Sequence, residues 1–207
     1  MSEDFADRST ILMQFGKIIG TQEQIAEYVD NRICLKCGAT LDDEWVIKRH
    51  DTFKRLRNLI DKYAFSKKLP RNDLGIKAQA IISYLLNIQH TFLRVMIRLD
   101  MIQHESFNEI FMDSLTTISK KVHQMMTSLK IMATQASENF EEILDTLELI
   151  IKLERQIDED NIIICRQISV ATGGDSDFTC YMMRKIVADL EHISDYVKEC
   201  AEIFAEI

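Results

Sequence analysis

A single proline, Pro70, interrupts the 207 residues of the chain, and only six glycines accompany it. These two residue types most often end helices, so the chain lacks the breakers that a fold of short strands and turns needs. Apolar residues make up 46% of the sequence, which is enough to bury a hydrophobic core. We therefore expect an all-α protein that forms one domain over residues 1–207, and an all-β fold is excluded.

Apolar residues recur along the chain at alternating steps of three and four, which is the spacing of one helix face. The same alternation is typical of helices that pack side by side in a bundle. Helices of this length make the bundle elongated. The spacing predicts six helices, which cover residues 4–33, 42–66, 72–101, 104–134, 136–168 and 176–206.

Two segments rich in helix breakers occupy similar places in the two halves of the chain. SKKLPRND at 66–73 separates the second and third predicted helices, as VATGGDSD at 170–177 separates the fifth and sixth. This arrangement indicates an internal repeat of three helices. We expect pseudo-repeats over residues 1–102 and 103–207.

Charge is distributed unevenly over a chain whose net charge is −8. Such an acidic surface repels phosphate backbones, so we expect no nucleic-acid partner. Residues 48–71 nevertheless carry nine Lys or Arg against two Asp, whereas residues 137–160 carry nine acids against two basic residues. We expect the second and fifth helices to attract each other, and the remaining positive charge to face an acidic partner or anionic lipid.

The composition predicts a cytoplasmic location. The opening MSEDFADRST is acidic and polar, unlike a signal peptide, and we expect no apolar run near the roughly 18 residues of a membrane span. Five cysteines are an odd number, in keeping with reduced thiols in that compartment.

The fifth predicted helix carries acids where apolar residues belong. Glu154 interrupts its apolar seam, and Asp158 lies one turn further on the same face. A carboxylate in a seam is costly unless it pairs with a cation or binds a metal. Two interpretations stay open, namely a buried ion pair with a basic residue of helix 42–66, and a metal site.

The sixth predicted helix repeats the spacing with Glu191 and Asp195. Two carboxylates at i and i+4 can share a hard cation such as iron, magnesium or manganese. At 100° per residue, however, both acids point away from the apolar stripe of this helix. They therefore belong either to a metal site on the outer surface of the bundle or to an ordinary solvated face.

Cys34 and Cys37 form a separate motif, Cys-Leu-Lys-Cys-Gly, between the first two predicted helices. Two thiolates at this spacing can hold one zinc ion, but no second pair exists in the chain. Zinc would need either a homo-oligomer whose chains share these cysteines or a further ligand such as His50. A redox pair and a loop without function are the alternatives.

Four short segments resemble the PhoU-like superfamily: LERQID at 153–158, LEHISDY at 190–196, LPRNDL at 69–74 and LLNIQH at 85–90. The nearer branch is that of the Pit accessory proteins, also called phosphate transport regulators. The resemblance implies two three-helix halves and an iron or zinc cluster, with Glu154, Asp158, Glu191 and Asp195 as ligands. The first half departs from the family's acidic pattern, because Asp51 and His90 each lack their polar partner four residues before.

The resemblance implies a non-enzymatic, metal-binding regulator of phosphate transport. Its expected partner is a membrane phosphate transporter or the transporter's signalling partner, which it would meet peripherally at the inner membrane face. A ferritin-like di-metal carboxylate enzyme is the first alternative, although the Glu-x-x-His motif of such sites is not present in the sequence. A metal-free helical scaffold is the second.

Overall fold

The computed structural model describes residues 5–35, 43–102, 109–135, 140–171, 173 and 178–207. These ranges contain helices and no strands, which confirms the predicted all-α class. The helices are α1 (Arg8–Leu35), α2 (Asp43–Asn58), the 3-10 helix η1 (Leu59–Lys68), α3 (Asp73–Met101), α4 (Glu109–Gln135), α5 (Phe140–Ala171) and α6 (Phe178–Glu206).

Five of the six helices predicted from the apolar spacing form as single α-helices. The second prediction, 42–66, is divided: α2 ends at Asn58 and the chain continues as η1 to Lys68. In α4, apolar residues at alternating steps of three and four form a seam that is buried from Leu115 to Met132. Its methionines therefore belong to the core, as their spacing indicates.

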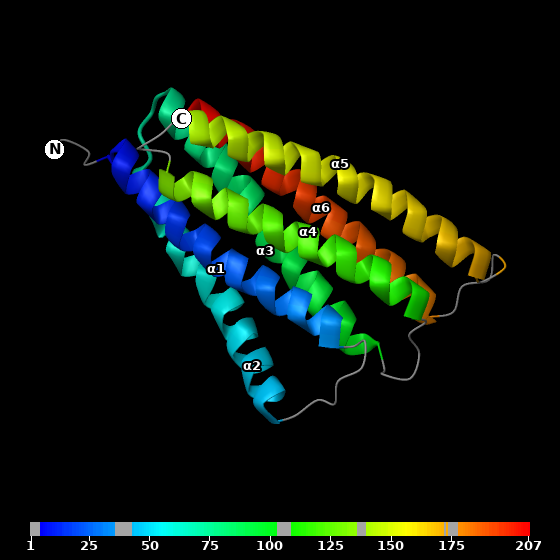
Figure 1. Cartoon of the computed structure of the whole chain (residues 1–207). Helices are drawn as coiled ribbons and strands as arrows, with labels where there is room; N and C mark the ends of the chain where they lie inside the picture. The colour runs from blue at the N-terminus through cyan, green and yellow to red at the C-terminus, as the bar shows by residue number, and fades with distance from the viewer. Residues whose placement is uncertain (1–4, 36–42, 103–108, 136–139, 172, 174–177) are drawn as a thin grey trace.

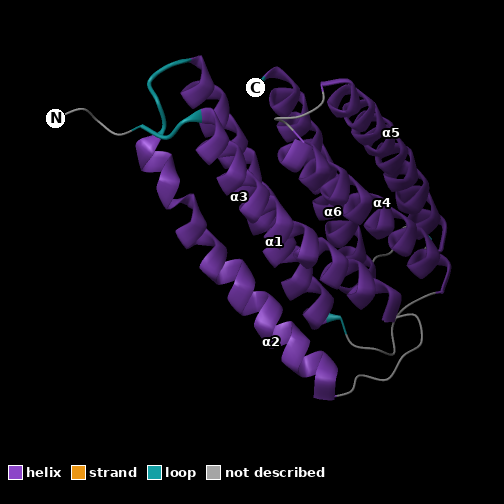
Figure 2. Ribbon diagram, turned by 60° about the vertical axis from the view of Figure 1, so that its left-hand side comes forward, coloured by secondary structure: helices purple, strands orange, loops and turns teal. Residues whose placement is uncertain are grey.

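The helices form an elongated bundle with a central group of four (Figures 1 and 2). In this group α1 packs mainly on α4, and α3 packs mainly on α6. The α5 helix lies outside α4 and α6, while α2 lies outside α1 and α3. Each outer helix therefore covers the two inner helices that come from its own half of the chain.

The start of α3 depends on a close approach of two backbone segments. Asn72 caps the helix by accepting a hydrogen bond from the Gly75 N–H, at 3.1 Å. A Cβ atom added to Gly75 would lie 1.7 Å from the carbonyl oxygen of Pro70. Only glycine therefore fits at this turn between η1 and α3.

Aromatic contacts join η1 to the central helices. The ring of Phe15, on α1, packs edge-on against Phe65 of η1 at 5.6 Å and against Phe204 of α6 at 5.5 Å between centroids. Phe15 is fully buried. Burial of such a ring stabilises the fold by about 2 kcal/mol, so this cluster helps to anchor η1.

The charged residues of α2 pair with partners other than α5. Asp100 of α3 forms ion pairs with Arg32 of α1, whose Nη2 lies 3.4 Å from Oδ1, and with Arg49 of α2, whose Nη2 lies 2.6 Å from Oδ2. The α2 and α5 helices lie on opposite sides of the bundle (Figure 1). The predicted attraction between the two helices is therefore wrong as a contact, because each packs on the inner helices of its own half.

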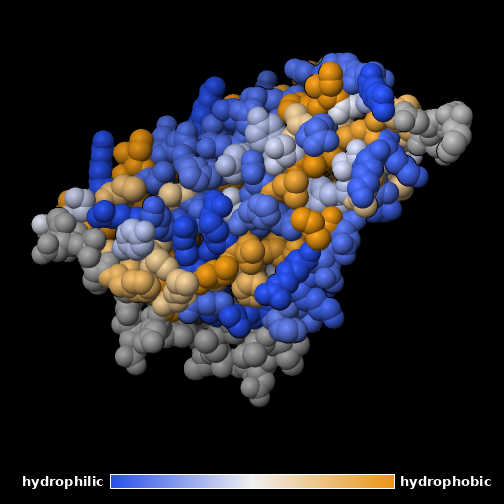
Figure 3. Space-filling view, turned by 180° about the vertical axis from the view of Figure 1, so that it is seen from behind, coloured by the Kyte–Doolittle hydropathy of each residue, from blue (hydrophilic) through white to orange (hydrophobic). Residues whose placement is uncertain are grey.

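The α3 helix is long and apolar enough to cross a membrane by length and composition, so the expectation that no segment would approach a span is wrong by this measure. Half of the most apolar 18-residue stretch of α3 is buried inside the bundle. The neighbours of α3 there are mainly α6 and α1. Some apolar side chains do reach the surface, Ile76 among them. On the back of the molecule, hydrophobic residues at the surface lie among hydrophilic ones (Figure 3).

Candidate metal centre

The predicted acids meet where α5 packs on α6. The apolar seam of α5, with Ile150, Ile157 and Ile164 buried, sets the rotation of this helix. One face of α5 thereby turns Glu154 and Asp158 toward α6. The acids of α6 point away from α3 but toward α5, because α5 lies on the flank of α6 and not in the central group.

Three of the four predicted ligands converge. One carboxylate oxygen from each of Asp158, Glu191 and Asp195 lies within 4.8 Å of the others. All three residues are partly exposed, and in the described part of the chain no Lys or Arg forms an ion pair with them. We call these three residues the acidic trio. The solvated face considered for Glu191 and Asp195 is thus a half-buried surface shared with α5.

The environment of the acidic trio opposes ionisation. Burial raises the pKa of Asp158, Glu191 and Asp195 above the ordinary values, and neighbouring carboxylates raise it further. The carboxylate that raises the pKa most is Glu154 for Asp158, Asp195 for Glu191 and Asp158 for Asp195. The ionised form of each carboxylate is therefore destabilised, and a bound cation would stabilise it.

Glu154 has a different partner. Its Oε1 lies 2.8 Å from the Nζ of Lys198 on α6, and the Glu154 side chain is only 9% exposed. Glu154 therefore forms an ion pair, as one of the two interpretations expected, but its cation comes from α6 and not from the predicted helix 42–66. Lys198 lies one turn after Asp195 on the same helix face, a spacing from which this partner could have been found in the sequence.

The acidic trio has the properties of a site for an oxygen-preferring cation. The Oδ1 atom of Asp158 is buried and has no hydrogen-bond partner in the described part of the chain, so a ligand position is available there. His192 stands beside the trio, with its Nε2 atom 3.6 Å from Glu191, but its side chain is half exposed. Three carboxylates without a thiolate suit iron, manganese or magnesium better than zinc.

A buried ion pair fixes α6 against α3 near this site. Asp189 is 4% exposed and accepts hydrogen bonds from Arg94, at 3.2 Å, and from Arg98. Both arginines come from α3. Because Asp189 lies just before Glu191 in the sequence, this pair helps to set the position of the acidic trio.

The remaining residues considered in the sequence are Asp51 and His90 of the first half and the pair Cys34 and Cys37. Asp51 and His90 of the first half are exposed, and neither belongs to a cluster of three ligands among the described residues. Cys34 lies at the end of α1, with its Sγ 3.9 Å from Oδ1 of Asp30. Cys37 lies outside the described residues, so the zinc motif stays a prediction.

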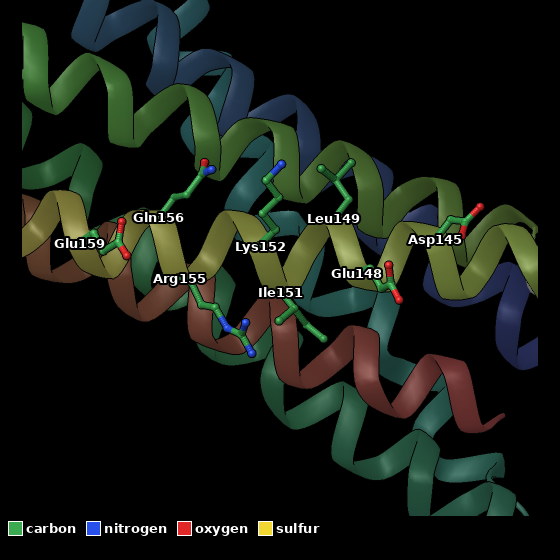
Figure 4. A pocket seen from close by; sticks show the side chains of 8 residues that line it. All are labelled: Asp145, Glu148, Leu149, Ile151, Lys152, Arg155, Gln156 and Glu159. Carbon is green, nitrogen blue, oxygen red and sulfur yellow. The ribbon is translucent and has the colours of Figure 1, made fainter.

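A shallow hollow on α5 differs from an enclosed substrate cavity. All eight residues that line it belong to this one helix. In Figure 4, Leu149, Lys152 and Gln156 project to one side of α5, while Ile151 and Arg155 project to the other. The acidic trio contributes no residue to this surface.

Comparison with protein families gives a match in the second half of the chain. Residues 115–204 match the model of the PhoU domain. The PhoU match contains the whole of α5 and most of α6, and with them all four acids and Lys198. It supports the PhoU-like resemblance and a regulatory role in phosphate transport. Comparison with curated proteins and with solved structures finds no match.

Proposed function

We propose that the protein is a non-enzymatic, metal-binding regulator of phosphate transport from the Pit accessory branch. The observation that carries the proposal is the convergence of the acidic trio within the PhoU match. Asp158 would hold the cation from α5, and Glu191 and Asp195 would hold it from α6. When bound, the cation would supply positive charge that joins the two helices.

Iron is the metal we propose first, because the PhoU-like resemblance implies iron or zinc and a trio that offers only carboxylate oxygens disfavours zinc. The helices on either side are long and packed on the central group, so the carboxylates are held on stiff elements. Neutralising the repulsion within the trio would favour the packed arrangement of α5 on α6. Binding of the metal is thereby coupled to the position of the outer helix α5.

The surface that meets the transporter is proposed to be the basic side of α2 and η1. Within the described chain, Lys54, Arg57, Lys67 and Lys68 are exposed and form no ion pair with a carboxylate. This concentration of positive charge suits an acidic cytoplasmic surface of a membrane transporter or the anionic lipid around it. The protein would then work in the cytoplasm, peripherally at the inner membrane face.

Deleting the protein and measuring phosphate uptake tests this function. We expect altered uptake or altered repression in phosphate-rich medium, and we expect the double substitution Asp158→Ala and Asp195→Ala to reproduce part of that change. Glu159→Ala is the matched control, since Glu159 is an exposed acid of α5 outside the trio. Normal uptake in the deletion strain, together with oxidase or hydrolase turnover by the metal-loaded protein, would favour the carboxylate enzyme instead.

A further inference from the structure

Glu154 and Lys198 stand at one edge of the acidic trio. Glu154 precedes Asp158 by one turn on α5, and Lys198 follows Asp195 by one turn on α6. The two charges meet at 2.8 Å across the same α5–α6 boundary that the trio occupies. A fourth carboxylate is therefore next to the trio but is already engaged by a cation that belongs to the chain.

The charges of Glu154 and Lys198 change the pKa values of the acidic trio. Glu154 raises the pKa of Asp158, Glu191 and Asp195, whereas Lys198 lowers the pKa of Asp158 and Asp195. Lys198 is thus close enough to offset part of the repulsion among the acids. Its positive charge changes the pKa of these carboxylates in the same direction as a bound metal ion would, although with a single unit of charge.

We propose that Lys198 is a tethered competitor of the metal, which holds Glu154 away from the ion bound by the trio and so limits the affinity of the site. This inference rests on the proposed metal-binding function. Glu154 is almost fully buried, and a buried carboxylate does not give up its cation without replacement. A metal ion can recruit Glu154 only by displacing the Lys198 ammonium.

The proposal predicts that the effects of Lys198→Met and Glu154→Gln on the affinity for Mn²⁺ are not additive. Lys198→Met leaves Glu154 without a cation and makes it available as a fourth carboxylate ligand. Since affinity for hard cations rises with the number of charged ligands, this variant should bind Mn²⁺ about tenfold more tightly than the native chain. Glu154→Gln alone should change the affinity by less than about threefold, because Glu154 is not a ligand while Lys198 holds it.

The test is a calorimetric titration of the full chain with Mn²⁺ alone, after removal of metal by chelator. The native chain is compared with Lys198→Met, Glu154→Gln and the double variant, in which the gain should disappear. Lys198→Arg is the matched control that keeps the charge, and its affinity should equal that of the native chain. Lys198→Gln replaces Lys198→Met if the latter does not fold.

Thermal unfolding of the same proteins gives a second readout. Without metal, Lys198→Met should unfold at a lower temperature than the native chain, because it leaves a buried carboxylate unpaired, and Mn²⁺ should raise its unfolding temperature by more.

Two results separate the possible failures. If the native chain binds Mn²⁺ and Lys198→Met binds it no more tightly, the inference about Lys198 is wrong while the proposed function stands. If neither protein binds Mn²⁺ or, in the same titration under anaerobic conditions, Fe²⁺, both are wrong.

Discussion

Replacing Asp195 by Asn should make the metal-free protein more stable at neutral pH. The substitution keeps the size of the side chain and removes one negative charge from the acidic trio. In the native chain this charge faces Asp158 and Glu191 without a Lys or Arg partner in the described residues. The carboxylates would thus be retained for binding, at a cost in stability when no cation is present.

The separation of the carboxylates sets the size of this effect. Two unit charges 4.8 Å apart repel by about 1 kcal/mol in water and by about 3 kcal/mol at the effective dielectric constant of a protein surface. Asp195 faces two such neighbours, and all three groups are partly exposed, so the lower figure applies to each pair. We expect a gain of about 1–2 kcal/mol, which corresponds to about 2–8 °C in unfolding temperature for a chain of this length.

The gain should depend on pH. Because the pKa of each trio acid is raised in the folded protein, the folded state binds protons more readily than the unfolded state. Stability is therefore lost as the pH rises from the ordinary values of 3.8 for Asp and 4.5 for Glu through the raised values. The advantage of Asp195→Asn should be full above this window and should vanish below it, where the native Asp195 is protonated in both the folded and the unfolded chain.

Thermal unfolding followed by circular dichroism in the presence of a chelator measures this difference over a series of pH values. Glu159→Gln serves as the control, because it removes an exposed charge from α5 outside the trio. A lower unfolding temperature for Asp195→Asn at neutral pH, or an equal gain at a pH below the ordinary pKa of 3.8 for Asp, would refute the reasoning.

Two further predictions concern the packing around α3. Asp189→Asn weakens the buried pair with the arginines of α3 and should lower the free energy of unfolding by about 2–3 kcal/mol in a urea titration, whereas an unchanged midpoint would mean that the pair contributes little. Gly75→Ala should destabilise the protein by about 1–3 kcal/mol in the same assay, because the new methyl group meets the Pro70 carbonyl. Gly16→Ala is its control: nothing lies within 4 Å of the added Cβ, so it should stabilise α1 by up to about 1 kcal/mol, and the same sign for both glycines would contradict the argument.

The helices could be predicted because their signals are local. Alternating steps of three and four place one apolar face on each helix, and a single proline leaves the helices uninterrupted. The break between α2 and η1 has no such signal, since the apolar spacing continues through Asn58.

The candidate site was predictable in its residues but not in its arrangement. The angle of Glu191 and Asp195 to the apolar stripe of α6 is a local property, whereas the side on which α5 packs depends on the whole bundle. The prediction that α2 lies beside α5 rested on their opposite net charge. It was wrong because long-range attraction between exposed charges is weak compared with the burial of apolar faces. Lys198 was missed as the partner of Glu154, although its place one turn after Asp195 puts it on the face of α6 that carries the acids.

The most direct test of the account is the metal content of the full chain, purified without chelator or affinity tag and incubated anaerobically with Fe²⁺ before elemental analysis. We predict that the native protein retains iron after desalting, and that the double variant Asp158→Ala and Asp195→Ala retains none while its helical circular dichroism signal is unchanged. Equal iron in both proteins, or none in the native one, would contradict a metal centre at the acidic trio.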